Sequence, residues 1–298
     1  MSKLSVLSNE LEEVVRVAGA AVVAVRGGRR AASGVVVAED LVVTAVRAVG
    51  RDEGVTVVLA DGTARQATLV GRDLGTELAL LGVEGGGLAV PRWRPAAEVA
   101  VGALVVAVGR PREQIRATLG MVSGVGGAWQ TGSGGDVDAW IDVDGSLPRG
   151  FSGGALAGAD GALIGMNTHG LTRTGAVVPA ATVARVVAQL QERGSTTPGY
   201  LGVGFFPALL GERETLIAVS VEPGGPGEGA GVLVGDALQA LDNTPVTGLR
   251  HLLGLLYTKG SGAVVELSLL RSGAAIDLSV TLGERPARRR GGARGRRR

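Results

Sequence analysis

Residues 150–156 read GFSGGAL, and this glycine-flanked serine decides how the rest of the chain is interpreted. Two earlier segments, VVTAVRAV at 42–49 and TELALL at 76–81, carry Arg47 and Glu77. A serine hydroxyl is a poor nucleophile unless a neighbouring group accepts its proton. Arginine cannot do so, because its guanidinium has no available lone pair and stays charged. The stretch is therefore either a nucleophile turn that needs another base or a glycine-rich turn with an inert serine.

Composition favours a protein built from short strands. The chain has 298 residues, enough for two domains, with 45% hydrophobic residues, 51 glycines and only 3% aromatics. Such a core consists mainly of Val, Leu and Ala, with many tight turns. Cysteine is absent, which excludes disulfides, thiolate zinc sites and a cysteine nucleophile. We predict no metal and no cofactor.

The pattern of apolar residues predicts a mainly β fold with helices at 10–18, 181–192 and 247–257. Gly and Pro in RGSTTPG place a domain boundary near 194–199. The candidate strands of the first part are 20–25, 35–38, 41–44, 55–59, 63–71, 78–83, 104–108, 117–123, 139–143, 162–168 and 175–178.

Charge is distributed unevenly along the chain. Residues 284–298 hold eight Arg and one Glu, a net +7, so the remainder carries −5 of the total of +2. The tail has no large apolar residue and is predicted to be disordered. It could contact nucleic acid phosphates, although it lacks interleaved aromatics, and a solubilising or protein-docking role is the alternative. Glu10, Glu12 and Glu13 interrupt any apolar signal sequence, so we expect a cytoplasmic protein that does not contact a membrane.

The order of several segments resembles the HtrA family of bacterial serine proteases. They are SGVVV, VVTAVRAV, TELALL, VGALVVAVGRP, GMVSGVG, GFSGGAL and GALIGMNT, followed by YLGV and VEPGGPGEGAGVLVGDALQALD. The resemblance implies a trypsin-like double antiparallel β-barrel and a sandwich-like PDZ domain with helices. The expected domains are 1–193 (protease fold), 194–199 (linker), 200–283 (PDZ) and 284–298 (tail). It also implies a homotrimer, although residues 1–30 contain no aromatic residue.

The resemblance places the family's catalytic His, Asp and Ser on Arg47, Glu77 and Ser152. The amides of Gly150 and Ser152 would form the oxyanion hole. Arg47 and Glu77 are expected to form an ion pair between the two barrels, and if it is buried, removing one partner would cost about 3–5 kcal/mol. His169 is the candidate substitute base, but its side chain is expected to face the cleft wall and not Ser152. Phe151 is expected to add bulk beside the site.

The resemblance also assigns a peptide site to the PDZ domain. The carboxylate-binding loop would be Tyr200, Leu201, Gly202 and Val203, and the opposite wall would be a helix with His251, Leu252 and Leu255. Its ligands would be peptides, protein C-termini or unfolded segments with an apolar end. The alternative is a domain that only packs against the first one.

One acidic run needs a separate interpretation. Asp136, Asp138, Asp142 and Asp144 are evenly spaced in DVDAWIDVDG, which on a single strand would put them on one face. The spacing of a calcium loop is absent, so we expect a solvated acidic strand or loop.

Taken together, these features predict a catalytically inactive HtrA-like protein that binds peptides as a scaffold or chaperone. The alternative is a weakly active serine endopeptidase that uses Ser152 with an unusual base.

Overall fold

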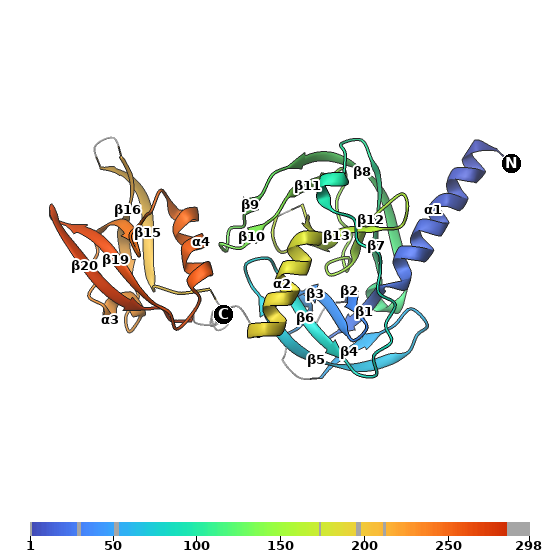
Figure 1. The fold of residues 1–298 in the computed structure, drawn as a ribbon, viewed down its shortest axis with the longest axis horizontal. Coiled ribbons are helices and arrows are strands. Elements are labelled where there is room, and N and C mark those ends of the chain that lie inside the picture. Colours follow the sequence, from blue (N-terminus) through green and yellow to red (C-terminus); the bar gives the residue numbers. More distant parts are fainter. Residues whose placement is uncertain are drawn as a thin grey trace, which may run out of the picture. The chain divides into compact units, whose positions relative to one another are not determined.

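The computed structural model describes residues 2–28, 31–50, 54–172, 174–194, 198–210 and 213–284. The chain forms two compact units, 1–197 and 198–298 (Figure 1). Residues 195–197 of the predicted linker and 285–298 of the predicted tail lie outside the described residues. No helix within the described ranges has the length and apolar character needed to cross a membrane.

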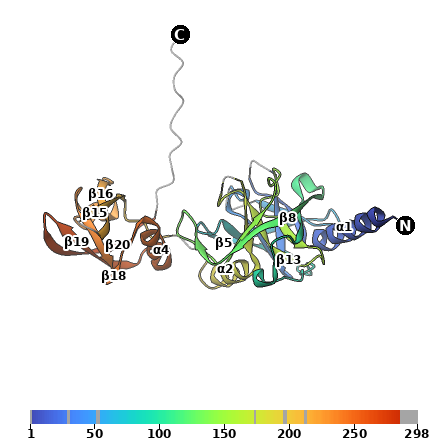
Figure 2. The same cartoon turned by 90° about the horizontal axis from the view of Figure 1, so that it is seen from above.

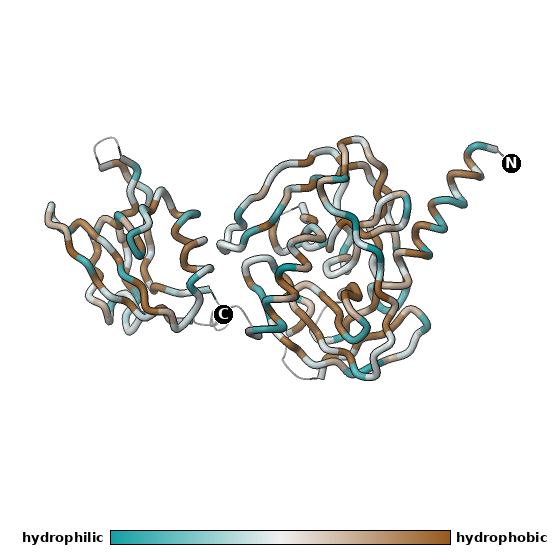
Figure 3. Tube along the Cα trace, viewed as in Figure 1, coloured by the Kyte–Doolittle hydropathy of each residue, from teal (hydrophilic) through white to brown (hydrophobic). Residues whose placement is uncertain are grey.

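The first strands of unit 1 form a closed antiparallel barrel in the order β1-β2-β3-β6-β5-β4. Closure is direct, because Val25 on β1 pairs with Ala32 on β2 and also with Val57 on β4. The strands are rich in Val and Leu, which suit a buried pleated surface (Figure 3). Their bounds are β1 (Val22–Arg26), β2 (Ala32–Ala38), β3 (Leu41–Ala45), β4 (Val55–Val58), β5 (Ala64–Asp73) and β6 (Leu78–Val83).

A second antiparallel sheet follows in the order β11-β8-β7-β12-β13-β14 and nearly closes, because β11 also lies beside β14. Its bounds are β7 (Leu104–Gly109), β8 (Arg116–Gly126), β11 (Trp140–Val143), β12 (Ala155–Gly158), β13 (Leu163–Thr168) and β14 (Ala176–Pro179). A separate hairpin joins β9 (Trp129–Gln130) and β10 (Asp136–Val137). These barrels confirm the predicted mainly β fold.

Two helices cover the barrels. The helix α1 (Lys3–Ala20) begins at Ser2, whose hydroxyl accepts the Ser5 amide at 3.1 Å, and its last turn packs beside β7 and β12. The helix α2 (Ala180–Arg193) packs against strands of both barrels (Figure 2). Both helices contribute to the core between the barrels, and both extend beyond the predicted ranges. Short 3₁₀ turns are η1 (Val46–Ala48), η2 (Ala96–Glu98) and η3 (Pro111–Glu113).

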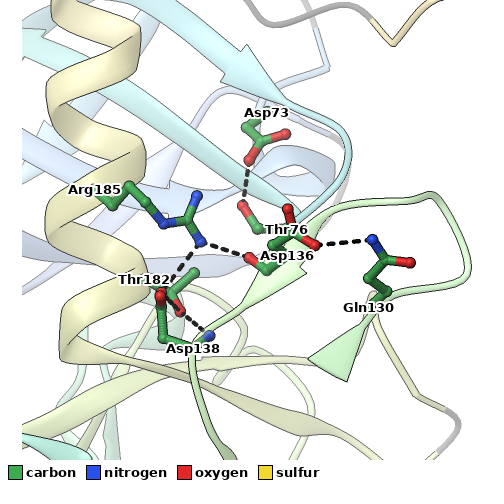
Figure 4. Close-up of polar contacts among 7 residues, drawn as sticks. All are labelled: Asp73, Thr76, Gln130, Asp136, Asp138, Thr182 and Arg185. Atoms are coloured by element: carbon green, nitrogen blue, oxygen red, sulfur yellow. Dashed lines mark hydrogen bonds and ion pairs between the residues drawn. The ribbon is translucent and has the colours of Figure 1, made fainter. Parts of the chain in front are cut away.

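The aspartates of the predicted solvated acidic strand or loop are all exposed, but they do not lie on one strand. Asp136 begins to pair in β10, whereas Asp142 lies in β11, so the carboxylates do not share one strand. Asp138 is exposed and also accepts hydrogen bonds from Thr182 at 2.6 Å and from Arg185 at 3.1 Å on α2 (Figure 4). The turn between Val137 and Trp140 breaks the alternation that the spacing suggested.

Unit 2 is one antiparallel sheet in the order β15-β16-β17-β19-β20 with two helices. Leucines and valines from the sheet and from α4 form its core. The elements are β15 (Val203–Leu210), β16 (Arg213–Val221), α3 (Pro226–Gly229), β17 (Ala237–Leu241), β18 (Thr244–Pro245), α4 (Leu249–Lys259), β19 (Val264–Arg271) and β20 (Ala274–Thr281). A bidentate ion pair from Arg271 to the buried Asp236 holds the pKa of that carboxyl below its ordinary value.

Candidate functional site

The serine turn between β11 and β12 is held in place by its neighbours. Gly153 has φ +86°, and a Cβ there would lie only 1.9 Å from the carbonyl oxygen of Ser33, so glycine is required. Phe151 is 1% exposed and packs in the core of the second barrel. The expectation that Phe151 adds bulk beside the site is therefore wrong, because the ring points into the core.

Ser33 on β2 anchors this turn across the barrel interface. Its hydroxyl donates to the carbonyl of Gly150 at 2.8 Å and accepts the amide of Arg110 at 2.8 Å, and its own amide donates to the carbonyl of Ser152 at 3.1 Å. Ser33 is fully buried, so these bonds are shielded from water. Ser33 thus positions both residues of the predicted oxyanion hole, Gly150 through its hydroxyl and Ser152 through its backbone amide.

His169 contacts the serine directly. Its Nδ1 lies 2.8 Å from Ser152 Oγ, and its backbone amide donates to the same oxygen at 3.1 Å. The prediction that this side chain faces the cleft wall is wrong. The backbone after β13 leaves His169 half-buried beside the serine turn, and a second hydrogen bond holds the ring in that orientation.

That second bond assigns the tautomer of the imidazole. His169 Nε2 lies 2.8 Å from the carbonyl oxygen of Leu147, which can only accept. The proton of the neutral ring is therefore on Nε2, and Nδ1 presents a lone pair to the Ser152 hydroxyl. Serine donates to imidazole, and imidazole donates to a backbone carbonyl.

The Arg47–Glu77 ion pair is present. Arg47 Nε lies 3.0 Å from Glu77 Oε1, but the Arg47 side chain is 71% exposed while that of Glu77 is 13% exposed. Both residues belong to the first barrel, in η1 and immediately before β6. The pair therefore does not bridge the barrels as predicted, and the conditional cost of a buried pair does not apply to Arg47.

Glu77 adopts an unusual backbone and reaches the second barrel. It has φ +63°, a left-handed conformation that is rare for a residue with a side chain. Its carboxyl group packs on Gly170, where a Cβ would lie 2.1 Å from Glu77 Cδ. Glu77 Oε2 is buried and has no hydrogen-bond partner among the described residues. Burial raises the pKa of the Glu77 carboxyl, and the charge of Arg47 opposes this shift.

The loop before Glu77 is fixed by a buried carboxylate. Asp73 accepts the amide of Gly75 at 2.9 Å and the hydroxyl of Thr76 at 2.6 Å (Figure 4). Thr131, which follows β9, donates to the carbonyl of Gly75 at 2.7 Å. These contacts make the left-handed turn at Glu77 part of a rigid loop.

A cavity of about 320 Å³ opens in the second barrel next to this site. It shares Leu147 with the His169 hydrogen bond, and Asn167 lines it from β13. Further lining residues include Ser146, Gly175, Ala176 and Val177.

Hydrogen bonds hold the predicted peptide-site loop in unit 2. Tyr200 exchanges two backbone hydrogen bonds of 3.0 Å with Gly283, and its hydroxyl donates to Glu222 at 2.7 Å. Gly202 has φ +68°, which turns the chain into β15. Leu201 is 3% exposed and packs in the core, and Val203 begins β15.

The helix α4 lies beside β15, but its predicted residues differ in environment. His251 and Leu255 are half-buried, and the amide and hydroxyl of Thr247 lie 3.3 Å and 3.1 Å from His251 Nδ1. Leu252 is only 1% exposed and packs in the core, so it holds the helix on the sheet.

Sequence reasoning missed three contributors to the first site: Ser33, the carbonyl of Leu147 and Gly170. Ser33 stands in the segment SGVVV, but a hydroxyl inside an apolar strand was the only signal. A backbone carbonyl has no sequence signal at all.

The comparisons with known proteins agree with this geometry. Residues 32–166 match the family model of a trypsin-like peptidase domain, and residues 199–282 match that of a PDZ domain. Among solved structures, the serine endoprotease from Yersinia pestis has a TM-score of 0.71 at 27% identity, with 92% of this chain and 98% of that chain covered. The HtrA-type protease AlgW with tripeptide has a TM-score of 0.70 at 26% identity, with 93% and 97% covered.

Curated relatives are similar over a shorter part of their length. A probable periplasmic serine endoprotease DegP-like from Rhizobium meliloti (strain 1021) is 34% identical over 205 residues, which are 64% of this chain and 40% of the relative. The periplasmic pH-dependent serine endoprotease DegQ from Escherichia coli (strain K12) is 32% identical over 197 residues, 61% of this chain and 43% of the relative. The chain thus covers about two fifths of the relatives it matches.

Fold and site together define a trypsin-like peptidase domain joined to a PDZ domain. The chain belongs to the HtrA family. The prediction of a cytoplasmic location is contradicted, because the similar relatives are named periplasmic endoproteases.

Proposed function

We propose that this chain is an HtrA-family protein that captures extended peptides through its PDZ domain and does not cleave them by the family's Ser–His–Asp relay. The domains are assigned as 1–193 for the peptidase fold and 200–283 for the PDZ domain. The names of the relatives favour the periplasm as its location. A homotrimer and a nucleic-acid contact of the tail stay predictions.

One observation carries the loss of the relay. Arg47, at the position of the family's base, forms a 3.0 Å ion pair with Glu77. A guanidinium accepts no proton from Ser152 and releases its own only at very high pH. Loss of the base from such a triad leaves only the roughly 10³–10⁴-fold assistance that binding and an oxyanion hole provide.

The open edge of β15 supports peptide capture. Among the described strands, β15 pairs only with β16, so its other edge offers unpaired amides and carbonyls to an added strand. Phe206 and Leu209 on β15 are 65% and 71% exposed. The neighbouring Leu255 offers an apolar surface from α4. The similar HtrA-type protease AlgW was solved with a tripeptide, which supports peptide binding by this chain.

Peptide capture is tested by fluorescence polarisation with labelled peptides that end in an apolar residue. Each peptide is compared with its C-terminal amide, which removes the terminal charge. We expect Leu255→Glu to weaken binding at least about tenfold, equivalent to about 1.4 kcal/mol. Val264→Glu, at a 65% exposed position on β19, is the matched control. Equal binding by both variants would contradict the proposed site.

Loss of the relay is tested separately with unfolded casein. Cleavage that disappears in Ser152→Ala would show that the peptidase domain cuts peptide bonds and would overturn that half of the proposal. No Ser152-dependent cleavage, together with peptide binding, is the expected result.

A further inference from the structure

The Ser152–His169 contact has the organisation of a nucleophile and its base, independently of the family's base position. Ser152 Oγ and His169 Nδ1 are 2.8 Å apart, which is hydrogen-bonding distance for proton transfer. The carbonyl of Leu147 holds the opposite ring nitrogen at 2.8 Å. It thereby fixes the neutral tautomer that accepts a proton at Nδ1, the orienting role that a carboxylate has in a triad.

Backbone donors lie in the same turn. Gly150 and Ser152 have amides that make no hydrogen bond to another described residue, whereas the neighbouring amides of Phe151 and Gly153 donate to Pro148 and Asn167. Two free amides on a rigid turn can stabilise the oxyanion of an acyl-transfer intermediate. Ser33 supports them by holding the carbonyl of Gly150.

We propose that Ser152 and His169 form a catalytic dyad that accepts acyl groups from activated esters. Ser152 Oγ bonds to the ester carbonyl carbon, the hydroxyl proton passes to His169 Nδ1, and the carbon–oxygen bond of the leaving group breaks. His169 then releases that proton to solvent, because the leaving group departs as an anion. In the second half, water attacks the acyl-serine and gives a proton to the neutral His169, which passes it to Ser152 Oγ. Ser152 recovers its proton as the carboxylic acid departs.

The arrangement restricts the leaving group. An amide nitrogen must be protonated as it leaves, and in the family's relay that proton comes from the position that Arg47 occupies. A guanidinium is too weak an acid to supply it. A phenolate with a low pKa leaves as an anion and needs no proton. Protonated His169 is an acid, but it does not stand at the position of the family's proton donor. We therefore expect the dyad to act on activated esters far faster than on peptide bonds, which is compatible with peptide capture without cleavage.

The experiment uses p-nitrophenyl acetate with the full chain and follows p-nitrophenolate release, with mass spectrometry of the Ser152 peptide to detect the acetyl adduct. We expect acetylation of the wild type and none of Ser152→Ala. His169→Asn places an amide oxygen near the Nδ1 position, so it keeps a hydrogen-bond acceptor but removes the base. We expect it to slow Ser152 acetylation at least about 100-fold. Gln114→Ala, at an exposed position between η3 and β8, is the control and should retain the wild-type rate.

Two outcomes would overturn the dyad. One is the absence of Ser152-dependent acetylation in a wild type that melts cooperatively. The other is full activity in His169→Asn, which would make His169 only a positioning residue. Thermal melts of the variants separate misfolding from lost chemistry, and His169→Gln, with its amide near the Nε2 position, gives a second test if His169→Asn does not fold.

Ser152-dependent cleavage of a peptide amide at a rate similar to that of the ester would contradict the leaving-group restriction. Peptide polarisation is unaffected by any of these results, so the proposed peptide capture succeeds or fails separately.

Discussion

Two polar pairs lie near the same serine turn and differ in what they can do. Arg47–Glu77 joins an exposed cation that cannot accept a proton to a mostly buried carboxylate that makes no hydrogen bond to Ser152 among the described residues. Ser152–His169 joins two half-buried groups in a defined tautomer. The comparison teaches that a site can lose the residue types of a relay and still hold a nucleophile against a base from another strand.

Restoring the family's residues at the first pair should give the largest effect. We expect Arg47→His combined with Glu77→Asp to gain casein cleavage of at least about 100-fold, because a general base and acid then stands on the leaving-group side. The assay is fluorescent casein hydrolysis, with Ser152→Ala added to the double variant as the control. No gain would mean that Ser152 cannot leave the His169 hydrogen bond.

Removing the support of the second pair should have an intermediate effect. Ser33→Ala loses hydrogen bonds to Gly150 and Arg110 inside the protein, which should reduce the free energy of unfolding by about 2 kcal/mol. Urea denaturation measures this loss. Ser123→Ala, at an exposed position on β8, is the control and should be neutral. Equal stability of the two variants would show that Ser33 does not hold the serine turn.

The pH dependence of the first pair has a defined sign. Since burial raises the folded-state pKa of Glu77, the folded protein binds more protons between the unfolded and folded pKa values. The contribution of Glu77 to the free energy of unfolding therefore decreases as the pH rises from the unfolded-state pKa of this carboxyl through its folded-state pKa. We expect the Tm difference, Glu77→Gln minus wild type, to increase from pH 4 to pH 8. A difference that falls over this range would show that Arg47 lowers the pKa more than burial raises it.

The smallest effect is expected at the exposed end of the first pair. Arg47→Ala should change the free energy of unfolding by less than about 1 kcal/mol, because its guanidinium is largely in water. Differential scanning calorimetry can measure this change, with Arg16→Ala on the exposed face of α1 as a comparison. A loss of several kcal/mol would mean that Glu77 depends on Arg47 for its charge.

Much of the architecture follows from local sequence. Alternating valines and glycine turns predicted most barrel strands. Of the three predicted helices, the first two were too short and the third began two residues too early. The strand β12, with the sequence ALAG, was missed because all four residues are buried, which leaves no alternation to detect, and three of them are Ala or Gly. For the evenly spaced aspartates, the even spacing suggested a single strand. The chain instead leaves β10 after Val137 and begins β11 at Trp140, so Asp136 and Asp142 lie on two different strands.

The sequence by itself determined the two-domain organisation and the absence of the family's base, because both are matters of which residues stand in which order. It also brought Arg47 and Glu77 together as a pair. Only the tertiary structure decided that Arg47 is exposed, that Glu77 packs on Gly170 and that His169 faces Ser152. A side-chain direction depends on partners distant in the chain. For His169 these are Ser152 and the carbonyl of Leu147, 17 and 22 residues away, and only the packing of the second barrel places them around the ring.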